Sequence, residues 1–358
     1  MKKLSILALI LVFSSLGPTA ISAPNPAGQA VDAAKSESPG APKAEKSVTL
    51  HKIVIGNSTV NYAATAGTLI VRNAKDQPYA SMGYTAYAKT DVPDPSRRPI
   101  TFAYNGGPGS ASIWLHMGVL GPKRIVTAEA AITPPPPYKV VDNESSILDR
   151  TDLVMIDPVG TGFSRAVGDS KEKDFFSVDA DIESVSRFIK EYVTENGRWN
   201  SPKYLLGESY GTVRSAGVVD YLQTMEYMSF NGVILVSMAT DLELAVSDAY
   251  PGGQRSWPFL LPTFTAVAWY HKVLPGAPSE LEPLLNEARA FALGEYAHAL
   301  ALGNELPEAD RAAVIEKLHR LTGLSSDYLD RANLRVTMPQ FSQELLRGRR
   351  ETVGQLDA

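Results

Sequence analysis

The sequence predicts an α/β protein in which a β meander leads into a mostly parallel sheet and a helical segment follows. Over residues 48–103, short runs rich in β-branched and aromatic residues are separated by Gly, Asn, Asp and Pro, a pattern typical of a strand meander. After it, strand patterns such as DLVMIDP alternate with helical periodicity, as in DADIESVSRFIKEYV. Such alternation predicts parallel strands covered by helices. From about residue 250 only helical patterns continue.

Composition and charge argue against several classes of protein. The 358 residues are 44% hydrophobic and 20% charged, which suits a large buried core and not a disordered, fibrous or multi-span membrane protein. The 34 Lys and Arg residues and 39 Asp and Glu residues form no long run of one sign, so nucleic acid is not an expected partner. Because the chain has no cysteine, disulfides, thiolate metal sites and a cysteine nucleophile are excluded.

The first 23 residues have the pattern of an export signal. Lys2 and Lys3 precede the apolar run 4–16, and small, helix-breaking residues follow at 18–23. The alternative is an uncleaved anchor helix, although the apolar run is short for a membrane span. Residues 24–47, rich in Ala, Pro, Gly, Ser and Lys, are expected to form a disordered tether. We therefore expect a periplasmic or extracellular protein that is free of the membrane once the signal is removed.

The rest of the chain divides into a predicted core at 48–249, a helical cap or insertion at 250–350 and an end segment at 351–358. In the helical part, Ser279 and Glu282 have the spacing of a capping box. A second helix is predicted to begin at Pro307. Apolar residues at helical spacing predict its buried side, namely Val314, Leu318 and Leu321.

The strongest functional motif is Gly207-Glu208-Ser209-Tyr210-Gly211. It follows the apolar strand pattern 204–206 and precedes a helical pattern at 212–221. A G-x-S-x-G at a strand-to-helix junction is the nucleophile elbow of α/β-hydrolases, whose small flanking residues let a strained turn expose the serine hydroxyl. The alternative is a chance match in a glycine-rich turn. The flanking strand and helix favour the α/β-hydrolase fold with Ser209 as nucleophile.

A second motif, NGGPGS at 105–110, follows directly after the strand pattern 100–104. A tetrahedral intermediate needs two backbone N–H groups directed at its oxyanion, and glycines let the chain approach closely enough to supply one of them. In an α/β-hydrolase the residue after the nucleophile, here Tyr210, supplies the other. The alternative is an ordinary Gly-Pro turn. Together with the elbow, the motif favours an oxyanion hole.

With these motifs in this order, the sequence resembles the serine carboxypeptidases, the family of carboxypeptidase Y and cathepsin A. The segments FAYNGGPGSAS, DLVMIDPVGTGFSR and YLLGESYGT carry the resemblance, which covers about residues 48–244 and extends more loosely through the helical part. The resemblance implies that Ser209 is the nucleophile and that the N–H groups of Gly107 and Tyr210 form the oxyanion hole.

The resemblance also implies that Asn105 and Glu208 bind the terminal carboxylate of a peptide. A carboxyl group kept protonated by low pH or burial can donate a hydrogen bond to that carboxylate, whereas an ionised one repels it. Cleavage under acidic conditions is therefore expected. The alternative for Glu208 is an exposed acid on a turn.

Two positions depart from the family pattern. The family's second glutamate in the carboxylate network falls at Val119, so the acid pair is incomplete and exopeptidase specificity is less secure. The cysteine of the family's motif is replaced by Ser110, and the family's disulfides cannot form. The absence of these cysteines suggests a bacterial-type branch.

No histidine of the chain fits the expected general base. In α/β-hydrolases the acid and then the histidine follow the serine, on loops after later strands. After Ser209 come only His271, His298 and His319, each in a helical pattern. Asp241 is a weak alternative for the acid. We therefore expect that the triad Asp and His, and the last strands of the sheet, are missing from this chain, which looks truncated at its C-terminus.

The histidines before Ser209 predict no metal site. His51 and His116 have no carboxylate at ligand spacing, and no phosphate-binding loop pattern is present, so we expect no cofactor.

The sequence thus predicts a serine carboxypeptidase that acts on peptide or protein C-termini through an acyl-enzyme on Ser209. Two alternatives remain at this point: an esterase or acyltransferase on the same fold, and a non-catalytic peptide-binding protein. The sequence predicts neither side-chain preference nor oligomeric state.

Overall fold

The computed structural model describes residues 42–127, 135–241 and 256–354. The predicted signal segment 1–23 lies outside these ranges, together with residues 24–41 of the predicted tether and the final residues 355–358. No helix within the described ranges is long and apolar enough to cross a membrane.

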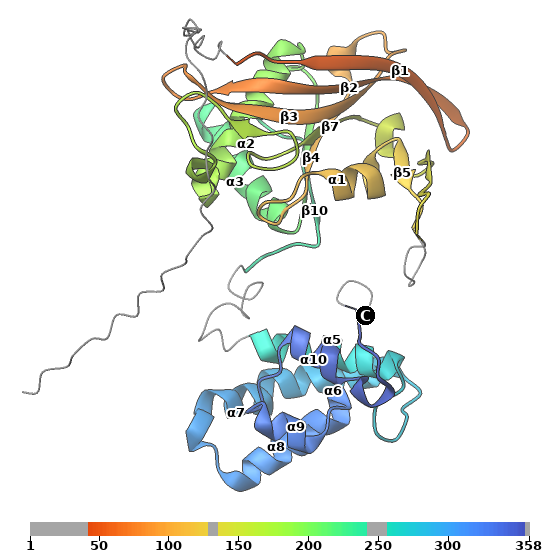
Figure 1. Ribbon diagram of the computed structural model, residues 1–358, viewed down its shortest axis with the longest axis vertical. Coiled ribbons are helices and arrows are strands. Elements are labelled where there is room, and N and C mark those ends of the chain that lie inside the picture. The colour runs from red at the N-terminus through yellow and green to blue at the C-terminus, as the bar shows by residue number, and fades with distance from the viewer. Residues whose placement is uncertain (1–41, 128–134, 242–255, 355–358) are drawn as a thin grey trace, which may run out of the picture. The chain divides into compact units, whose positions relative to one another are not determined.

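Eight strands of the described residues form one sheet in the order β1-β2-β3-β7-β4-β9-β10, with the short β8 paired beside β3 (Figure 1). Their bounds are β1 Lys46–Ile55, β2 Ser58–Arg72, β3 Pro78–Lys89, β4 Ile100–Tyr104, β7 Asp152–Ile156, β8 Arg165–Ala166, β9 Lys203–Glu208 and β10 Gly232–Val236. A separate hairpin pairs β5, Lys123–Ile125, with β6, Val140–Asp142.

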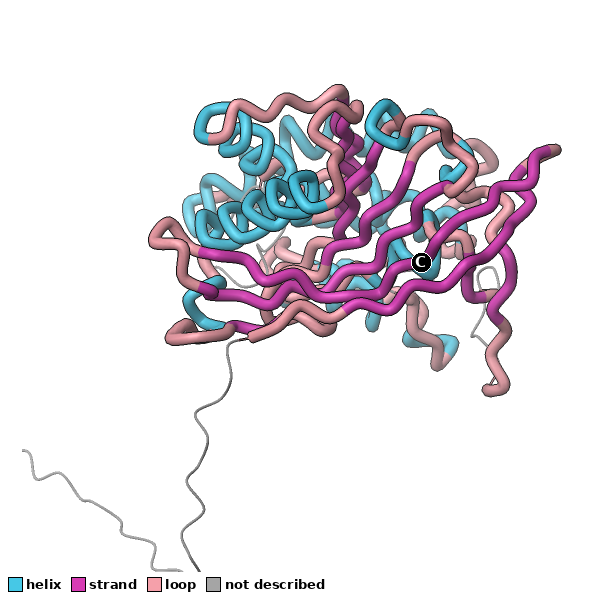
Figure 2. The backbone as a smooth tube through the Cα atoms, turned by 90° about the horizontal axis from the view of Figure 1, so that it is seen from above, coloured by secondary structure: helices cyan, strands magenta, loops and turns pink. Residues whose placement is uncertain are grey.

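The sheet is mixed, with the expected meander on one side and parallel strands on the other. Each neighbouring pair from β1 through β2 and β3 to β7 is antiparallel. Each neighbouring pair from β7 through β4 and β9 to β10 is parallel. Figure 2 shows these strands running side by side with a pronounced twist. Register places Tyr104 of β4 opposite Gly207 of β9, so the two sequence motifs follow neighbouring strand ends.

The central parallel strands β4 and β7 are buried along their whole length, because other elements cover both faces of the sheet there. Side chains alternate along β7, with Val154 and Ile156 in one core cluster and Leu153 and Met155 in another. Helix α2 contributes Phe188 to the first cluster, together with residues of α3. The bounds of the elements around the sheet are η1 Pro95–Arg97, α1 Ile113–Leu115, η2 His116–Leu120, η3 Ile147–Asp149, η4 Glu172–Phe175, α2 Val178–Glu195 and α3 Tyr210–Met225. Leu115 and Leu120, from α1 and η2, pack in the second cluster.

Strand β10 ends the strand order within the described residues. Four successive apolar side chains, Val233 to Val236, are each 38–45% exposed there. They are the residues of the parallel part with least cover, since β4 and β7 are fully buried. The absence of later strands from the chain stays a prediction.

The helical segment has a hydrophobic core of its own. Its elements are α5 Ser256–Tyr270, α6 Leu281–Phe291, η6 Ala292–Tyr296, α7 Ala297–Leu302, η7 Gly303–Glu305, α8 Glu308–Thr322, α9 Ser326–Arg331, α10 Met338–Glu344 and η8 Arg347–Arg349. The predicted buried stripe of α8 is confirmed, because Val314, Leu318 and Leu321 all lie in this core. Its role as a cap over the sheet stays a prediction.

The capping box predicted from Ser279 and Glu282 is wrong. Helix α6 begins at Leu281 with Glu280 at the N-cap position, and no side chain caps it by a hydrogen bond. The sequence spacing was correct, but the helix begins too late for Ser279 to reach the first free N–H groups.

Candidate active site

Ser209 lies on a strained turn between β9 and α3. Its backbone has φ 55° and ψ −123°, a conformation that is costly for a residue with a side chain. The turn closes because its flanking glycines leave space. A Cβ added to Gly207 would lie 2.2 Å from the backbone oxygen of Gly211. The Ser209 N–H donates to the Val236 carbonyl over 2.9 Å, which holds the turn against β10. This is the geometry expected of a nucleophile elbow.

The NGGPGS segment packs directly against this elbow. A Cβ on Gly106 would lie 2.4 Å from the Tyr210 backbone nitrogen and 2.6 Å from the Glu208 carbonyl oxygen. Glycine is therefore required at position 106 by a close approach of two backbones. The neighbouring Gly107 is exposed and has φ 102°. The two segments predicted to supply the oxyanion hole thus lie together.

Asn105 and Glu208 are joined by a hydrogen bond. The Asn105 amide Nδ2 donates to Glu208 Oε2 over 3.0 Å, and the Gly106 N–H points to the same oxygen at 3.5 Å. Asn105 is only 2% exposed, and its Oδ1 accepts from the Leu115 N–H at 3.0 Å. Glu208 is half-buried. An amide nitrogen has two N–H groups, so Asn105 can also donate to a second carboxylate at this position.

A buried ion pair beneath the motifs was missed by sequence reasoning. Arg214 on α3 is 1% exposed, and its Nε lies 2.8 Å from Asp181 Oδ2 on α2. Its Nη1 donates to the Asn105 carbonyl oxygen over 2.8 Å. The guanidinium carbon lies 5.2 Å from the ring centroids of both Tyr104 and Tyr210. A lone arginine in a helical pattern gave no sequence signal for this arrangement.

Tyr210 is held by the same group of residues. Burial is the main reason that its pKa is raised to about 12, and the nearby Asp181 adds to the rise. Its hydroxyl therefore stays protonated at all ordinary pH values. The Tyr210 ring lies against the guanidinium of Arg214. Because Tyr210 is the first residue of α3, this contact helps to fix the first turn of the helix and with it the Tyr210 N–H.

No side chain of the described residues forms a hydrogen bond with the Ser209 hydroxyl. His319 Nδ1 instead bonds to the Leu324 carbonyl at 2.6 Å within the helical segment. His271 has a buried Nε2 without a partner among the described residues, and His298 is exposed on α7. Asp241 follows β10 at the end of the range 135–241. The structure therefore brings the predicted nucleophile and binding residues together, but no histidine or carboxylate of the described ranges forms a hydrogen bond with the Ser209 hydroxyl.

The two departures from the family pattern lie near the site. Val119, at the position of the second acid, is 55% exposed in η2. Ser110 closes the glycine segment, and its N–H donates to the Gly106 carbonyl over 3.3 Å. The described residues contain no group of three His, Asp or Glu side chains that could hold a metal ion.

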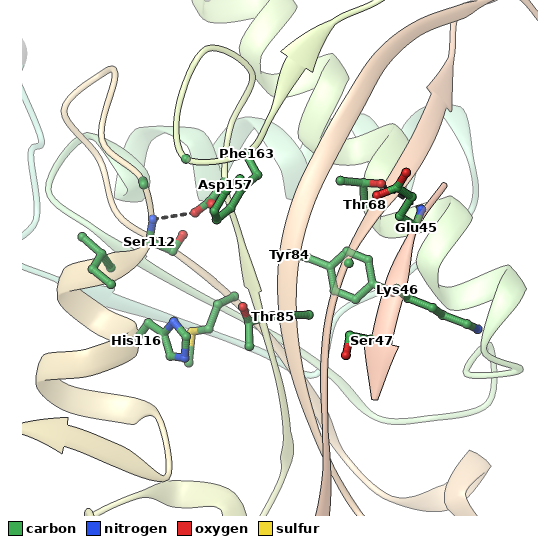
Figure 3. A pocket seen from close by; sticks show the side chains of 16 residues that line it. Glu45, Lys46, Ser47, Thr68, Tyr84, Thr85, Ser112, His116, Asp157 and Phe163 are labelled. Carbon is green, nitrogen blue, oxygen red and sulfur yellow. Dashed lines mark hydrogen bonds between the residues drawn. The ribbon is translucent and has the colours of Figure 1, made fainter. Parts of the chain in front are cut away.

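A separate cavity of about 670 Å³ lies beside the segment that follows NGGPGS (Figure 3). Ser112 and Asp157 line it together with Tyr84, Thr85, His116 and Phe163. The Ser112 N–H donates to Asp157 Oδ1 over 2.9 Å. Burial raises the pKa of the Asp157 carboxyl above its usual value, and backbone hydrogen bonds from Ser112 and Phe163 partly oppose that rise. Neither Ser209 nor Glu208 lines this cavity, so it is distinct from the site at the elbow.

Comparison with known families gives one match that covers more than half of the chain. The family model described as serine carboxypeptidase matches residues 43–242. The match includes both motifs and ends just after β10. No curated protein sequence matches the chain.

Several solved structures resemble the chain at low identity. The Kex1 prohormone-processing carboxypeptidase of Saccharomyces cerevisiae is 18% identical over 73% of this chain and 53% of its own, with a TM-score of 0.41. The proline iminopeptidase of Mycobacterium smegmatis is 14% identical over 72% of each chain, with a TM-score of 0.31. The juvenile hormone epoxide hydrolase of Bombyx mori is 10% identical over 66% of this chain and 46% of its own, with a TM-score of 0.28. The chain thus spans about half the length of the Kex1 carboxypeptidase.

Proposed function

Because the chain belongs to the serine carboxypeptidase family, we propose that it binds peptide C-termini and removes the last residue through an acyl-enzyme on Ser209. Its fold is that of the α/β-hydrolases. In the proposed reaction, Ser209 Oγ attacks the carbonyl carbon of the last peptide bond. The C–N bond breaks, and the proton of the Ser209 hydroxyl passes to the amine of the departing C-terminal residue. Water then hydrolyses the acyl-enzyme and releases the shortened peptide.

The N–H groups of Gly107 and Tyr210 are proposed to stabilise the oxyanion of this reaction. Supporting this, the close approach of Gly106 to the Tyr210 nitrogen brings the two segments together, and the Tyr210 N–H lies at the start of helix α3. Donors fixed in this way need little reorganisation when negative charge develops on the carbonyl oxygen.

The hydrogen bond between Asn105 and Glu208, directly beside Ser209, is the observation on which the carboxypeptidase assignment rests most. We propose that these two side chains bind the terminal carboxylate of the peptide. Asn105 has a second N–H to offer, and a protonated Glu208 can donate its O–H. An esterase or acyltransferase has no need of a carboxylate site at this position, so the pair favours a carboxypeptidase.

The partners and the location of the protein follow from the same proposal. Its substrates are peptide or protein C-termini, and the predicted signal segment would direct it to the periplasm or outside the cell. We assign the general base to none of the three histidines after Ser209. Because no described side chain forms a hydrogen bond with the Ser209 hydroxyl, a non-catalytic peptide-binding role is the second candidate.

The proposal is tested with a blocked dipeptide and its C-terminal amide. Calorimetric titration gives the dissociation constant of each peptide, and chromatography detects release of the C-terminal residue. We expect the acid to bind at least about 10-fold more tightly, the value of one hydrogen bond to a charged group. Ser209→Ala should keep this preference and abolish release. Equal binding of acid and amide would contradict the proposal, and preference without release from the wild type would support the non-catalytic role.

A further inference from the structure

Arg214, on the helix that follows Ser209, makes a contact with the NGGPGS segment and a second contact with helix α2. It donates to the backbone carbonyl of Asn105 on one side and pairs with Asp181 on the other, each at 2.8 Å. We propose that Arg214 is a positioning residue that orients the Asn105–Gly106 peptide for binding a terminal carboxylate. This inference rests on the proposed function and assigns to one further residue the selectivity for a free C-terminus.

The planarity of the peptide bond connects Arg214 to the other side of the Asn105–Gly106 unit. This bond is trans, so its C=O and N–H groups point in opposite directions. With the Asn105 oxygen held by Arg214 Nη1, the Gly106 N–H is directed toward Glu208 Oε2, at 3.5 Å. A rotation of this peptide plane would break the first contact and turn the N–H away from the second. Arg214 therefore fixes the direction of a donor that it does not touch.

The side chain is also rigid. Its guanidinium carbon lies 5.2 Å from the ring centroids of Tyr104 and Tyr210, and the residue is 1% exposed. The guanidinium of Arg214 and the carboxylate of Asp181 are both largely buried. A buried charge is costly without a partner, and Asp181 supplies the opposite charge that Arg214 needs. A planar guanidinium can donate to Asp181 and to the Asn105 oxygen at once, whereas a lysine ammonium has no such fork. The geometry thus requires arginine and not simply a positive charge.

Arg198 offers a matched control for the structural part of this role. It is 7% exposed, pairs with Asp152 Oδ2 at 2.7 Å and donates to the backbone carbonyl of Arg98 at 2.8 Å. Like Arg214, it bridges an aspartate and a backbone oxygen. Asp152 begins strand β7, so this pair lies at the opposite strand ends from Ser209. Loss of either arginine should lower stability, but only loss of Arg214 should alter selectivity for the carboxylate.

The experiment measures the dissociation constants of the blocked dipeptide acid and of its amide by calorimetry, together with the melting temperature. Ser209→Ala is the background, so that binding is separated from any turnover. Into it are introduced Arg214→Lys, Arg214→Met, Arg198→Lys and Asp181→Asn. We expect both lysine variants to melt at lower temperature. The ratio of the amide to the acid dissociation constant should fall about 10-fold in Arg214→Lys and stay within about twofold of the background in Arg198→Lys.

The Asp181→Asn variant separates the two contacts of Arg214. The one side-chain oxygen of the asparagine can take the place of Asp181 Oδ2 and accept from Arg214 Nε. The contact of Arg214 with the Asn105 oxygen should therefore persist, and the ratio should be retained. If the ratio of the amide to the acid dissociation constant is unchanged in Arg214→Lys and in Arg214→Met, the positioning role of Arg214 is overturned. The proposed function would then still stand. An equal fall in Asp181→Asn would also overturn the positioning role, because the effect would then belong to the ion pair. A background protein that does not discriminate acid from amide would overturn the proposed function and this inference together.

Discussion

The side-chain amide of Asn105 donates a hydrogen bond to the Glu208 carboxylate over 3.0 Å. The two residues lie at neighbouring ends of β4 and β9, and Ser209 follows Glu208 directly. A binding pair and a nucleophile are therefore placed by one pairing of parallel strands.

Asn105→Asp should weaken the binding of peptides with a free C-terminus by at least about 10-fold at neutral pH. The new Oδ1 still accepts from Leu115, but an oxygen replaces the N–H that faces Glu208 and would meet the peptide carboxylate. Calorimetric titration of the acid and amide peptides measures the effect. Asn73→Asp adds the same charge in the turn between β2 and β3, where Oδ1 accepts from Lys75, and should leave binding unchanged. Similar losses in both variants would count against a specific role for Asn105.

Gly106→Ala should lower the free energy of unfolding by about 1–3 kcal/mol or more. Its Cβ would lie 2.4 Å from the Tyr210 nitrogen, so the motif segments must separate. Gly118→Ala is the matched control, because nothing lies within 4 Å of its added Cβ. Urea unfolding of the two variants gives the comparison. If Gly106→Ala were as stable as Gly118→Ala, the close contact between the segments would be wrong.

Ser209→Gly should be more stable than Ser209→Ala by about 1 kcal/mol. Glycine adopts φ 55° and ψ −123° without the steric cost that alanine retains. Both variants lack the hydroxyl, so the difference reports the relief of backbone strain less the larger conformational entropy that glycine loses on folding. Chemical denaturation of both variants tests this expectation. A glycine variant that is less stable than the alanine variant would contradict the expected strain, because the strain relieved would then be smaller than the entropy cost of glycine.

Asp157→Asn should become more stable relative to the wild type as pH rises from about 4 toward neutral. Burial raises the pKa of Asp157 in the folded protein, so the folded state binds more protons than the unfolded chain in this interval. The free energy of unfolding of the wild type therefore falls as the carboxyl ionises. The variant keeps an acceptor for the Ser112 N–H but does not titrate. Unfolding curves at several pH values measure the difference, and a difference independent of pH would contradict the prediction.

The elbow could be predicted from sequence because its signals are local. Gly207, Ser209 and Gly211 lie within five residues, and the strand and helix on either side have clear patterns. The meander and the parallel strands were predicted for the same reason. The capping box failed although its spacing fitted, because α6 begins at Leu281, which places Glu280 and not Ser279 at the N-cap position.

The contact between Asn105 and Glu208 could not be derived from spacing, since 103 residues separate them and only the family resemblance suggested it. Arg214 shows a further limit. An arginine in a helix is usually solvent-exposed, and its burial here depends on Asp181, 33 residues earlier on another helix. Such pairs become visible only when the packing of both helices on the sheet is known.

The most direct test of the account is a crystal structure of Ser209→Ala with a bound blocked dipeptide. We expect the peptide carboxylate to lie within about 3.2 Å of Asn105 Nδ2 and of a Glu208 oxygen. We also expect the carbonyl oxygen of the last peptide bond to face the N–H groups of Gly107 and Tyr210. A carboxylate bound elsewhere, for instance in the cavity beside Asp157, would contradict the central claim that this pair recognises a free C-terminus.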